Sequence, residues 1–295
     1  MNQLEFAEQL SPPPQPELAV EPIAPPSAPA PVSGSSPPPT SFVFALGQVD
    51  PRFPSLAVEK EFAQVIGRAD TAGQTERQAL QTTLADRVNR YLARQMCWVF
   101  TIEGLETYLL APRDPADFEL LIEAVRPRPH PSDVDVIIGV QGPIAPPEAC
   151  NGLMVPLVVF DQLYSFDRDE LINQIPQPED SAEEEFRATA AELFDRIMQV
   201  ADNAGATDEH RTLNYLAVRY PAIYARTAQA HSGELSLTGV EVRPSRLANS
   251  TRKITDAIFS YTHRRTDVIE KYFVRVDVTE EFPFLVTKLS PFYER

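Results

Sequence analysis

The amino-acid sequence predicts an α+β protein in which an antiparallel or mixed sheet packs against helices, preceded by a disordered arm. Apolar residues recur at helical spacing in some segments and alternate at strand spacing in others. The two kinds of segment do not alternate regularly, which favours α+β over a doubly wound sheet. Twelve of the 29 prolines lie within the first 40 residues. We therefore expect a disordered Pro/Ala/Ser-rich arm over residues 1–40 and one domain over 41–295.

The first half of this domain is predicted to mix short strands and helices. Strands are expected over 41–46, which Gly47 ends, over 97–102 and over 107–110, the last two forming a hairpin around Gly104. Further strands are expected over 134–140 and 155–160, where apolar residues alternate or run together. Helices are expected over 57–67 and over 114–125, the latter capped by Asp114. Another helix is predicted from a capping box at Thr75 to residue 93, because apolar residues recur there every four positions: Leu80, Leu84, Val88 and Leu92.

The second half begins with helices and ends with strands. A second capping box at Ser181 is expected to open a long helix that ends near Gly205. Helices are also expected over 208–219 and 221–230. Strands are predicted over 235–242, with a bulge at Gly239, and over 254–262 and 271–279.

Composition excludes several classes of function. The chain has 26 basic and 42 acidic residues, a net charge of −16, which argues against nucleic acid and against an anionic membrane surface as partners. Since no stretch approaches about 18 consecutive apolar residues, we expect no transmembrane helix. The N-terminus lacks the basic and apolar regions of a signal peptide. Two cysteines make no disulfide framework, so a reduced, cytoplasmic location is expected.

Motifs for cofactor chemistry are missing from the sequence. Neither metal-ligand spacing nor a G-x-S-x-G serine nor a glycine-rich phosphate loop is present, so we expect no metal and no cofactor. Cys97 lies in an apolar stretch and is expected to be an inert buried thiol, whereas Cys150 precedes an Asn-Gly turn and is expected to be exposed. The carboxylates around Asp161 to Glu170 are expected to lie in a solvated loop; the alternative is an acid–base pair.

Charge is unevenly distributed along the chain. Residues 167–209 hold 13 acidic and 3 basic residues, whereas residues 243–275 hold 8 basic and 3 acidic ones. Two predicted loops of the basic part carry arginines with small hydroxyl residues, a combination that holds carboxylate, sulfate or phosphate groups. We hypothesise that these loops form an anion- or peptide-binding patch. Two alternatives stay open: solvated hairpin loops, or a basic face that lies against the acidic helices. The predicted binding residues are Arg243, Arg246, His263, Arg264 and Arg265.

Three segments of the C-terminal part resemble a known family. Residues 214–221 (NYLAVRYP), 237–246 (LTGVEVRPSR) and 271–293 (KYFVRVDVTEEFPFLVTKLSPFY) are similar to the C-terminal domain of the cyanobactin maturation proteins PatG and PatA. The resemblance covers about residues 41–295. It implies an accessory role in the biosynthesis of ribosomal peptide natural products. The family domain has no established activity, and the serine-protease segments that accompany it in PatG are missing here, so no catalytic residue can be transferred.

Three functions are compatible with these observations. The leading hypothesis is a non-catalytic binding or scaffold domain whose partner is a precursor peptide or a maturation enzyme of the pathway. The first alternative is a peptide-tailoring or hydrolytic enzyme that uses His263 with Asp267 or Asp277, since histidine in a polar loop suits acid–base chemistry. The second alternative is a structural homodimer formed through the apolar run 282–293.

Overall fold

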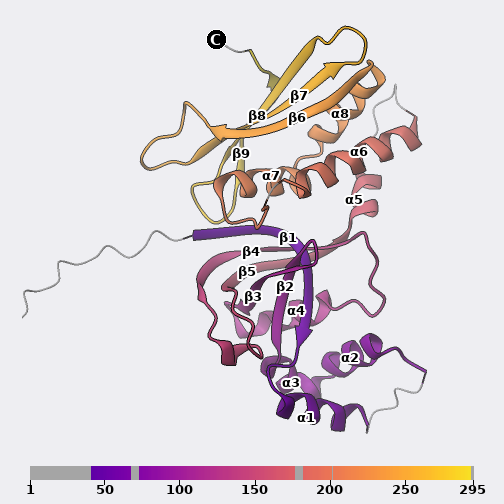
Figure 1. Cartoon of the computed structure of the whole chain (residues 1–295), viewed down its shortest axis with the longest axis vertical. Coiled ribbons are helices and arrows are strands. Elements are labelled where there is room, and N and C mark those ends of the chain that lie inside the picture. The colour runs from indigo at the N-terminus through magenta and orange to yellow at the C-terminus, as the bar shows by residue number, and fades with distance from the viewer. Residues whose placement is uncertain (1–40, 68–72, 177–181, 201, 294–295) are drawn as a thin grey trace, which may run out of the picture. The chain divides into compact units, whose positions relative to one another are not determined.

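The computed structural model describes residues 41–67, 73–176, 182–200 and 202–293. The predicted arm over residues 1–40 and the capping residue Ser181 lie outside the described residues. Within the described part, strands form two sheets and helices lie against both, which confirms the predicted α+β class (Figure 1). None of the described helices is long and apolar enough to span a membrane.

The first sheet closes into a five-stranded barrel. Its strands are β1 (Ser41–Arg52), β2 (Cys97–Ile102), β3 (Leu105–Pro112), β4 (Asp133–Ile144) and β5 (Pro156–Asp167). They are hydrogen-bonded in the order β1-β2-β3-β5-β4, and β4 pairs with β1 to complete the ring. All neighbours are antiparallel except β3 and β5, which are parallel. This strand order is that of the OB-fold, a small barrel that often serves as a binding module.

Short helices close the interior of the barrel. Helices α1 (Leu56–Ile66), α2 (Glu76–Ala85) and α3 (Arg90–Gln95) connect β1 to β2, and α4 (Phe118–Ala124) connects β3 to β4. The capping box at Thr75 is confirmed, but the helix predicted from it to residue 93 is wrong. At Asp86 the backbone is extended and the carboxylate caps the next turn instead, so Val88 points outward and is 79% exposed.

The C-terminal part consists of helices followed by an antiparallel sheet. The helices are α5 (Arg168–Gln174), α6 (Glu183–Met198), α7 (Asp208–Arg219) and α8 (Ala222–Ser232). The strands are β6 (Leu235–Pro244), β7 (Ile254–His263), β8 (Ile269–Asp277) and β9 (Phe284–Pro291), paired in this order. A register shift between Leu237 and Gly239 confirms the predicted bulge. The apolar run at 282–293 was not expected to be a strand; most of it forms β9 on the edge of the sheet.

Helices α6, α7 and α8 contribute to one buried cluster together with both sheets. The barrel supplies the outward-facing residues of β1 and β4, and the second sheet supplies one of its faces. Strand β1 therefore packs on both sides, since Val43 and Ala45 point into the barrel while Phe44 and Leu46 meet the helices. Cross-strand pairing places the other face of the second sheet away from these helices. The side chains on that other face include Arg243, Asp256, Phe273 and Arg275.

Two boundaries predicted for the barrel strands are wrong. Strand β1 continues past Gly47, where a Cβ atom would lie 2.2 Å from the carbonyl oxygen of Thr101. Glycine thus permits close contact with β2 rather than ending the strand. Strand β5 extends to Asp167, so Asp161 lies in a strand and not in a solvated loop.

A substitution at Gly205 tests the contact between β1 and the segment that precedes α7. Its φ is +72°, and a Cβ atom there would lie 2.4 Å from the Phe44 carbonyl oxygen. We expect Gly205→Ala to lower the free energy of unfolding by about 2–4 kcal/mol, from a left-handed backbone and from overpacking together. Gly104→Ala is the matched control, because Gly104 has φ +80° with nothing within 4 Å. Urea unfolding should show about 1 kcal/mol for this control, and equal losses in both variants would contradict the clash.

Candidate functional site

Arginine and aromatic side chains line a groove on the second sheet. The groove has a volume of about 670 Å³. We call it the arginine–aromatic groove. It is formed on the sheet face away from the helices, by strands β6, β7 and β8, the last residue of β9, and the residues that follow β6 and β9. Its lining residues are Arg243, Pro244, Arg246, Asp256, Phe273, Arg275, Pro291, Phe292 and Tyr293.

Strand pairing brings three charged groups into one row across the sheet. Arg243 of β6 lies opposite Asp256 of β7, which lies opposite Arg275 of β8. The Arg275 guanidinium donates two hydrogen bonds to the Asp256 carboxylate, at 2.6 and 3.2 Å. In the described part of the chain, neither Arg243 nor Arg246 has a carboxylate within ion-pair distance, so the groove retains positive charge.

Aromatic rings hold the groove's arginines in place. The guanidinium carbon of Arg243 lies 4.8 Å from the centre of the Phe292 ring, and that of Arg275 lies 5.1 Å from the Phe273 ring. The two rings meet edge to face at 5.8 Å. Such stacking limits the freedom of both guanidinium groups and does not occupy the N–H donors of Arg243. The arrangement can bind carboxylate or phosphate groups beside an apolar or aromatic side chain.

The predicted binding residues divide between the two ends of the second sheet. Arg243 and Arg246 lie at the groove, where β6 leaves the sheet. At the other end of β7, His263 pairs with Leu235, and the turn to β8 carries Arg264 and Arg265. The two loops therefore do not form one patch, because an antiparallel hairpin places its turn and its open end at opposite ends of the strands.

At the β7–β8 turn, local contacts occupy the predicted residues. The Arg265 guanidinium lies 3.1 Å from Glu234, and Arg264 Nε donates a hydrogen bond to the Ser236 hydroxyl at 3.1 Å. His263 Nδ1 accepts a hydrogen bond from the Arg265 backbone N–H at 3.2 Å. These contacts stabilise the turn, which gives its charged side chains a structural role.

The proposed acid–base residues do not converge. Asp267 lies in the turn with φ +55°, whereas Asp277 pairs with Ile254 at the far end of β7 from His263. Burial opposes ionisation of Asp277, yet hydrogen bonds from Thr279 and the nearby Arg252 outweigh it and lower the pKa of Asp277. An ionised carboxylate held by Arg252 at 2.6 Å has a structural role.

The groove residues that carry its ion pair and its stacked rings were not predicted from the sequence: Asp256, Phe273, Arg275 and Phe292. The alternation in β8 contained the signal, since Tyr272, Val274 and Val276 face the core and their neighbours must face the other way. Assignment of Asp256 and Phe292 required the pairing of β7 and the path of the chain after β9.

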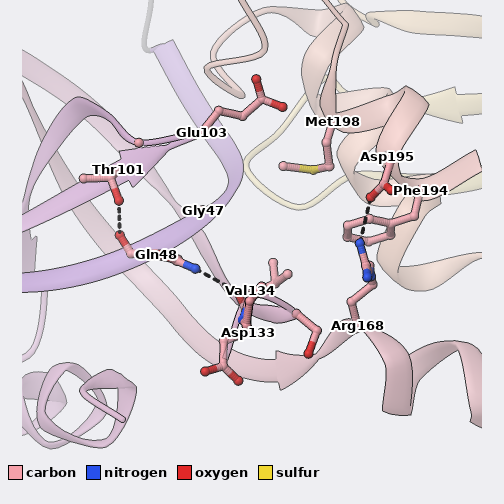
Figure 2. A pocket seen from close by; sticks show the side chains of 13 residues that line it. Gly47, Gln48, Thr101, Glu103, Asp133, Val134, Arg168, Phe194, Asp195 and Met198 are labelled. Carbon is pink, nitrogen blue, oxygen red and sulfur yellow. Dashed lines mark hydrogen bonds and ion pairs between the residues drawn. The ribbon is translucent and has the colours of Figure 1, made fainter. Parts of the chain in front are cut away.

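A smaller cavity lies between the barrel and α6 (Figure 2). Its volume is about 210 Å³, below the range of about 300–1,000 Å³ that is usual for ligand pockets. Arg168 and Asp195 pair across it at 2.9 Å, and Gln48 donates to the Asp133 carbonyl oxygen at 3.3 Å. Arg168 and Asp195 thus satisfy each other, and the small volume makes this cavity a weaker candidate than the groove.

Ser132, His130 and Asp167 meet beside this cavity but are not arranged for nucleophilic catalysis. The Ser132 hydroxyl donates to Asp167 and lies 2.6 Å from His130 Nδ1. In a hydrolytic triad the histidine stands between serine and carboxylate, whereas here the serine stands between the other two. Ser132 is also only 2% exposed, and Asp167 caps α5 through the Glu170 N–H. The cluster fastens the start of α5 to the barrel.

The face with which many OB-folds bind their ligands is covered in this protein. Ligands of that fold lie across β2 and β3. Here two outward side chains of these strands, Val99 and Leu109, are buried in a cluster with residues of the loop that connects β4 to β5. A disulfide between Cys97 of β2 and Cys150 of this loop joins the two.

The disulfide corrects the predictions made for both cysteines. Cys97 is not a lone thiol, and Cys150 is 3% exposed rather than accessible. The expectation of two thiols failed because nothing local to either residue indicates that they meet across 53 residues. The argument from cysteine content for a reducing location therefore loses its premise.

Among the described residues, no group of three or more His, Cys, Asp or Glu side chains is placed to hold a metal ion. The site defined by the structure is thus a surface groove of arginine and aromatic side chains. The protein that carries it is an OB-like barrel joined through helices to an antiparallel sheet.

Comparison with known proteins agrees with this architecture. Residues 180–292 match the family model described as PatG C-terminal. This part of the chain, which contains α6 to β9 and every groove residue except Tyr293, is similar to the PatG C-terminal family. A solved structure entitled "PatG Domain of Unknown Function" is similar with a TM-score of 0.68 and 18% identity, over 85% of this chain and 98% of that chain. At this identity the likeness establishes a shared fold. No curated protein matches the sequence.

Proposed function

We propose that this protein is an accessory binding domain of a cyanobactin-type peptide maturation system and that its arginine–aromatic groove holds an acidic peptide segment. The segment belongs to a precursor peptide or to a partner maturation enzyme. One observation carries the proposal: three guanidinium groups and two phenylalanine rings converge on an open groove that contains a single carboxylate, already paired.

Charge and shape support this class of ligand. Arginine forks bind carboxylates with two hydrogen bonds, and an aromatic wall suits a neighbouring apolar side chain. We expect neither nucleic acid nor a membrane surface to be a partner, because the chain as a whole carries a net charge of −16. A cytoplasmic location and a possible homodimer also remain predictions.

Binding can be measured by fluorescence anisotropy with a labelled peptide of alternating Asp, Glu and Phe. We expect Arg243→Gln with Arg246→Gln to weaken binding at least about tenfold, because charge-assisted hydrogen bonds contribute about 1.5–3 kcal/mol each. The matched control is Arg264→Gln with Arg265→Gln, which removes the same charge at the opposite end of the sheet. This control should change affinity less than about threefold.

Equal losses in both double variants would show that only net charge matters, and no loss in the groove variant would reject the groove. The same mixtures analysed by mass spectrometry separate binding from catalysis. An unchanged peptide mass fits an accessory domain. A mass change that disappears in His263→Ala would instead support the enzymatic alternative.

A further inference from the structure

Two carboxyl groups from distant parts of the chain meet where the barrel touches the second sheet. Asp161 belongs to barrel strand β5, and Glu281 lies in the loop that connects β8 to β9. The two carboxyls are neighbours, because the same nitrogen of Arg113, Nη2, lies within 4.0 Å of an oxygen of each. Their side chains are 25% and 16% exposed, so water screens their interaction only partly.

The cations around this pair do not balance two negative charges. Arg113, which follows β3, lies 2.7 Å from Asp161 but 4.0 Å from Glu281. Arg211 of α7 directs its guanidinium at backbone carbonyl oxygens of the same loop, those of Val278, Glu280 and Glu281. Asp208 also faces Arg211, at 3.8 Å. Glu281 therefore shares its cations with other acceptors.

One oxygen of Glu281 indicates which of the two carboxyl groups carries a proton. Glu281 Oε1 is buried, and no donor among the described residues forms a hydrogen bond with it. An ionised carboxylate in this position would be costly, whereas a protonated one can donate its O–H to Asp161. Burial and, after it, the neighbouring Asp161 together raise the pKa of Glu281 to about 7, although Arg113 and Arg211 oppose the change.

We propose that Asp161 and Glu281 share one proton and that this proton fastens the β8–β9 loop to the barrel, so that the attachment weakens as the pH rises through neutrality. Below that range the loop is held by a carboxylic acid–carboxylate hydrogen bond between the two parts. Above it, two adjacent negative charges repel each other. The device is independent of the groove and of its ligand.

The direction of the pH dependence follows from linkage. In the folded protein the pKa of Glu281 lies above its ordinary value of 4.5. Stability from the shared proton is thus fully present below about pH 4.5, falls as the pH rises toward 7, and is lost above it. Between pH 6 and pH 8, a group with a pKa near 7 changes the opening equilibrium about tenfold.

Hydrogen exchange of the full chain tests the proposal. We expect the protection of residues 278–284, corrected for intrinsic exchange rates, to fall about tenfold between pH 6 and pH 8. Glu281→Gln should abolish this dependence, since its amide donates to Asp161 at every pH. Glu280→Gln is the matched control, because Glu280 is exposed in the same loop and its side chain is outside the pair; it should keep the wild-type response.

Two results would overturn the shared proton. The first is protection of residues 278–284 that does not vary with pH in the wild-type chain. The second is a pH response that persists in Glu281→Gln. Should Glu281→Gln fail to fold, Asp161→Asn replaces it: an amide at position 161 can donate to an ionised Glu281, so the pH response should shrink and move to lower pH. A response identical to that of the wild-type chain would contradict the shared proton.

Discussion

Replacing both cysteines, Cys97→Ala with Cys150→Ala, is expected to lower the free energy of unfolding by about 4 kcal/mol. The disulfide joins residues 53 positions apart. Closing a loop of that length lowers the conformational entropy of the unfolded chain, which destabilises the unfolded state by about 4 kcal/mol. Trp98, the single tryptophan, is buried in the barrel next to Cys97 and reports the transition in urea.

The same variant should uncover the β2–β3 face of the barrel. Hydrogen exchange is expected to accelerate over residues 145–155, where the disulfide fastens the loop, while β7 and β8 remain protected. The control is wild-type protein in a strong reductant, which should reproduce the stability of the double variant. A loss of less than about 1 kcal/mol would show that the apolar contacts of Val99 and Leu109 hold the loop without the disulfide.

Arg211→Met is expected to cost about 3–5 kcal/mol. Arg211 is 2% exposed, donates to the carbonyl oxygens of Val278, Glu280 and Glu281, and lies over the Phe42 ring at 5.3 Å. Hydrogen bonds from a charged group contribute about 1.5–3 kcal/mol each, and methionine leaves these buried acceptors without donors. The arginine thus links α7, barrel strand β1 and the β8–β9 loop.

The matched control is Arg219→Met on the same helix. Arg219 is exposed and lies over the Tyr164 ring at 4.9 Å, a contact expected to contribute less than about 1 kcal/mol. Urea unfolding compares the two variants. Similar losses of stability would mean that removal of any α7 arginine has this effect. An Arg211→Met variant as stable as the wild-type chain would mean that water forms hydrogen bonds with the loop carbonyls.

Local rules predicted most elements of the fold. The capping box at Thr75, the hairpin around Gly104 and the bulge at Gly239 depend on residues that are close in sequence, and all three are present. The failures have local causes of a different kind. The Asp86 side chain accepts a hydrogen bond from the Val88 N–H and so ends the helix that periodicity predicts to continue. Gly47 allows β1 and β2 to approach closely and so does not end the strand.

The candidate site was predictable only in part. Arg243 and Arg246 were identified because arginines and a serine follow a strand, and they line the groove. Arg264 and Arg265 have the same local signature, yet they lie at the other end of the sheet. The two pairs are separated because β6, β7 and β8 are antiparallel, so the connections before and after β7 lie at opposite ends of the sheet, and the composition of the loops does not show this.

By itself, the sequence determined the α+β class, the order of the main helices and strands, and the basic character of the C-terminal part. These properties follow from spacing, capping and charge along a continuous stretch. The tertiary structure alone decided the closure of the barrel, the disulfide that fastens the β4–β5 loop to β2, the composition of the groove and the proximity of Asp161 to Glu281. Each of these joins residues far apart in the chain, and their contact arises only when strands pair and their faces pack together.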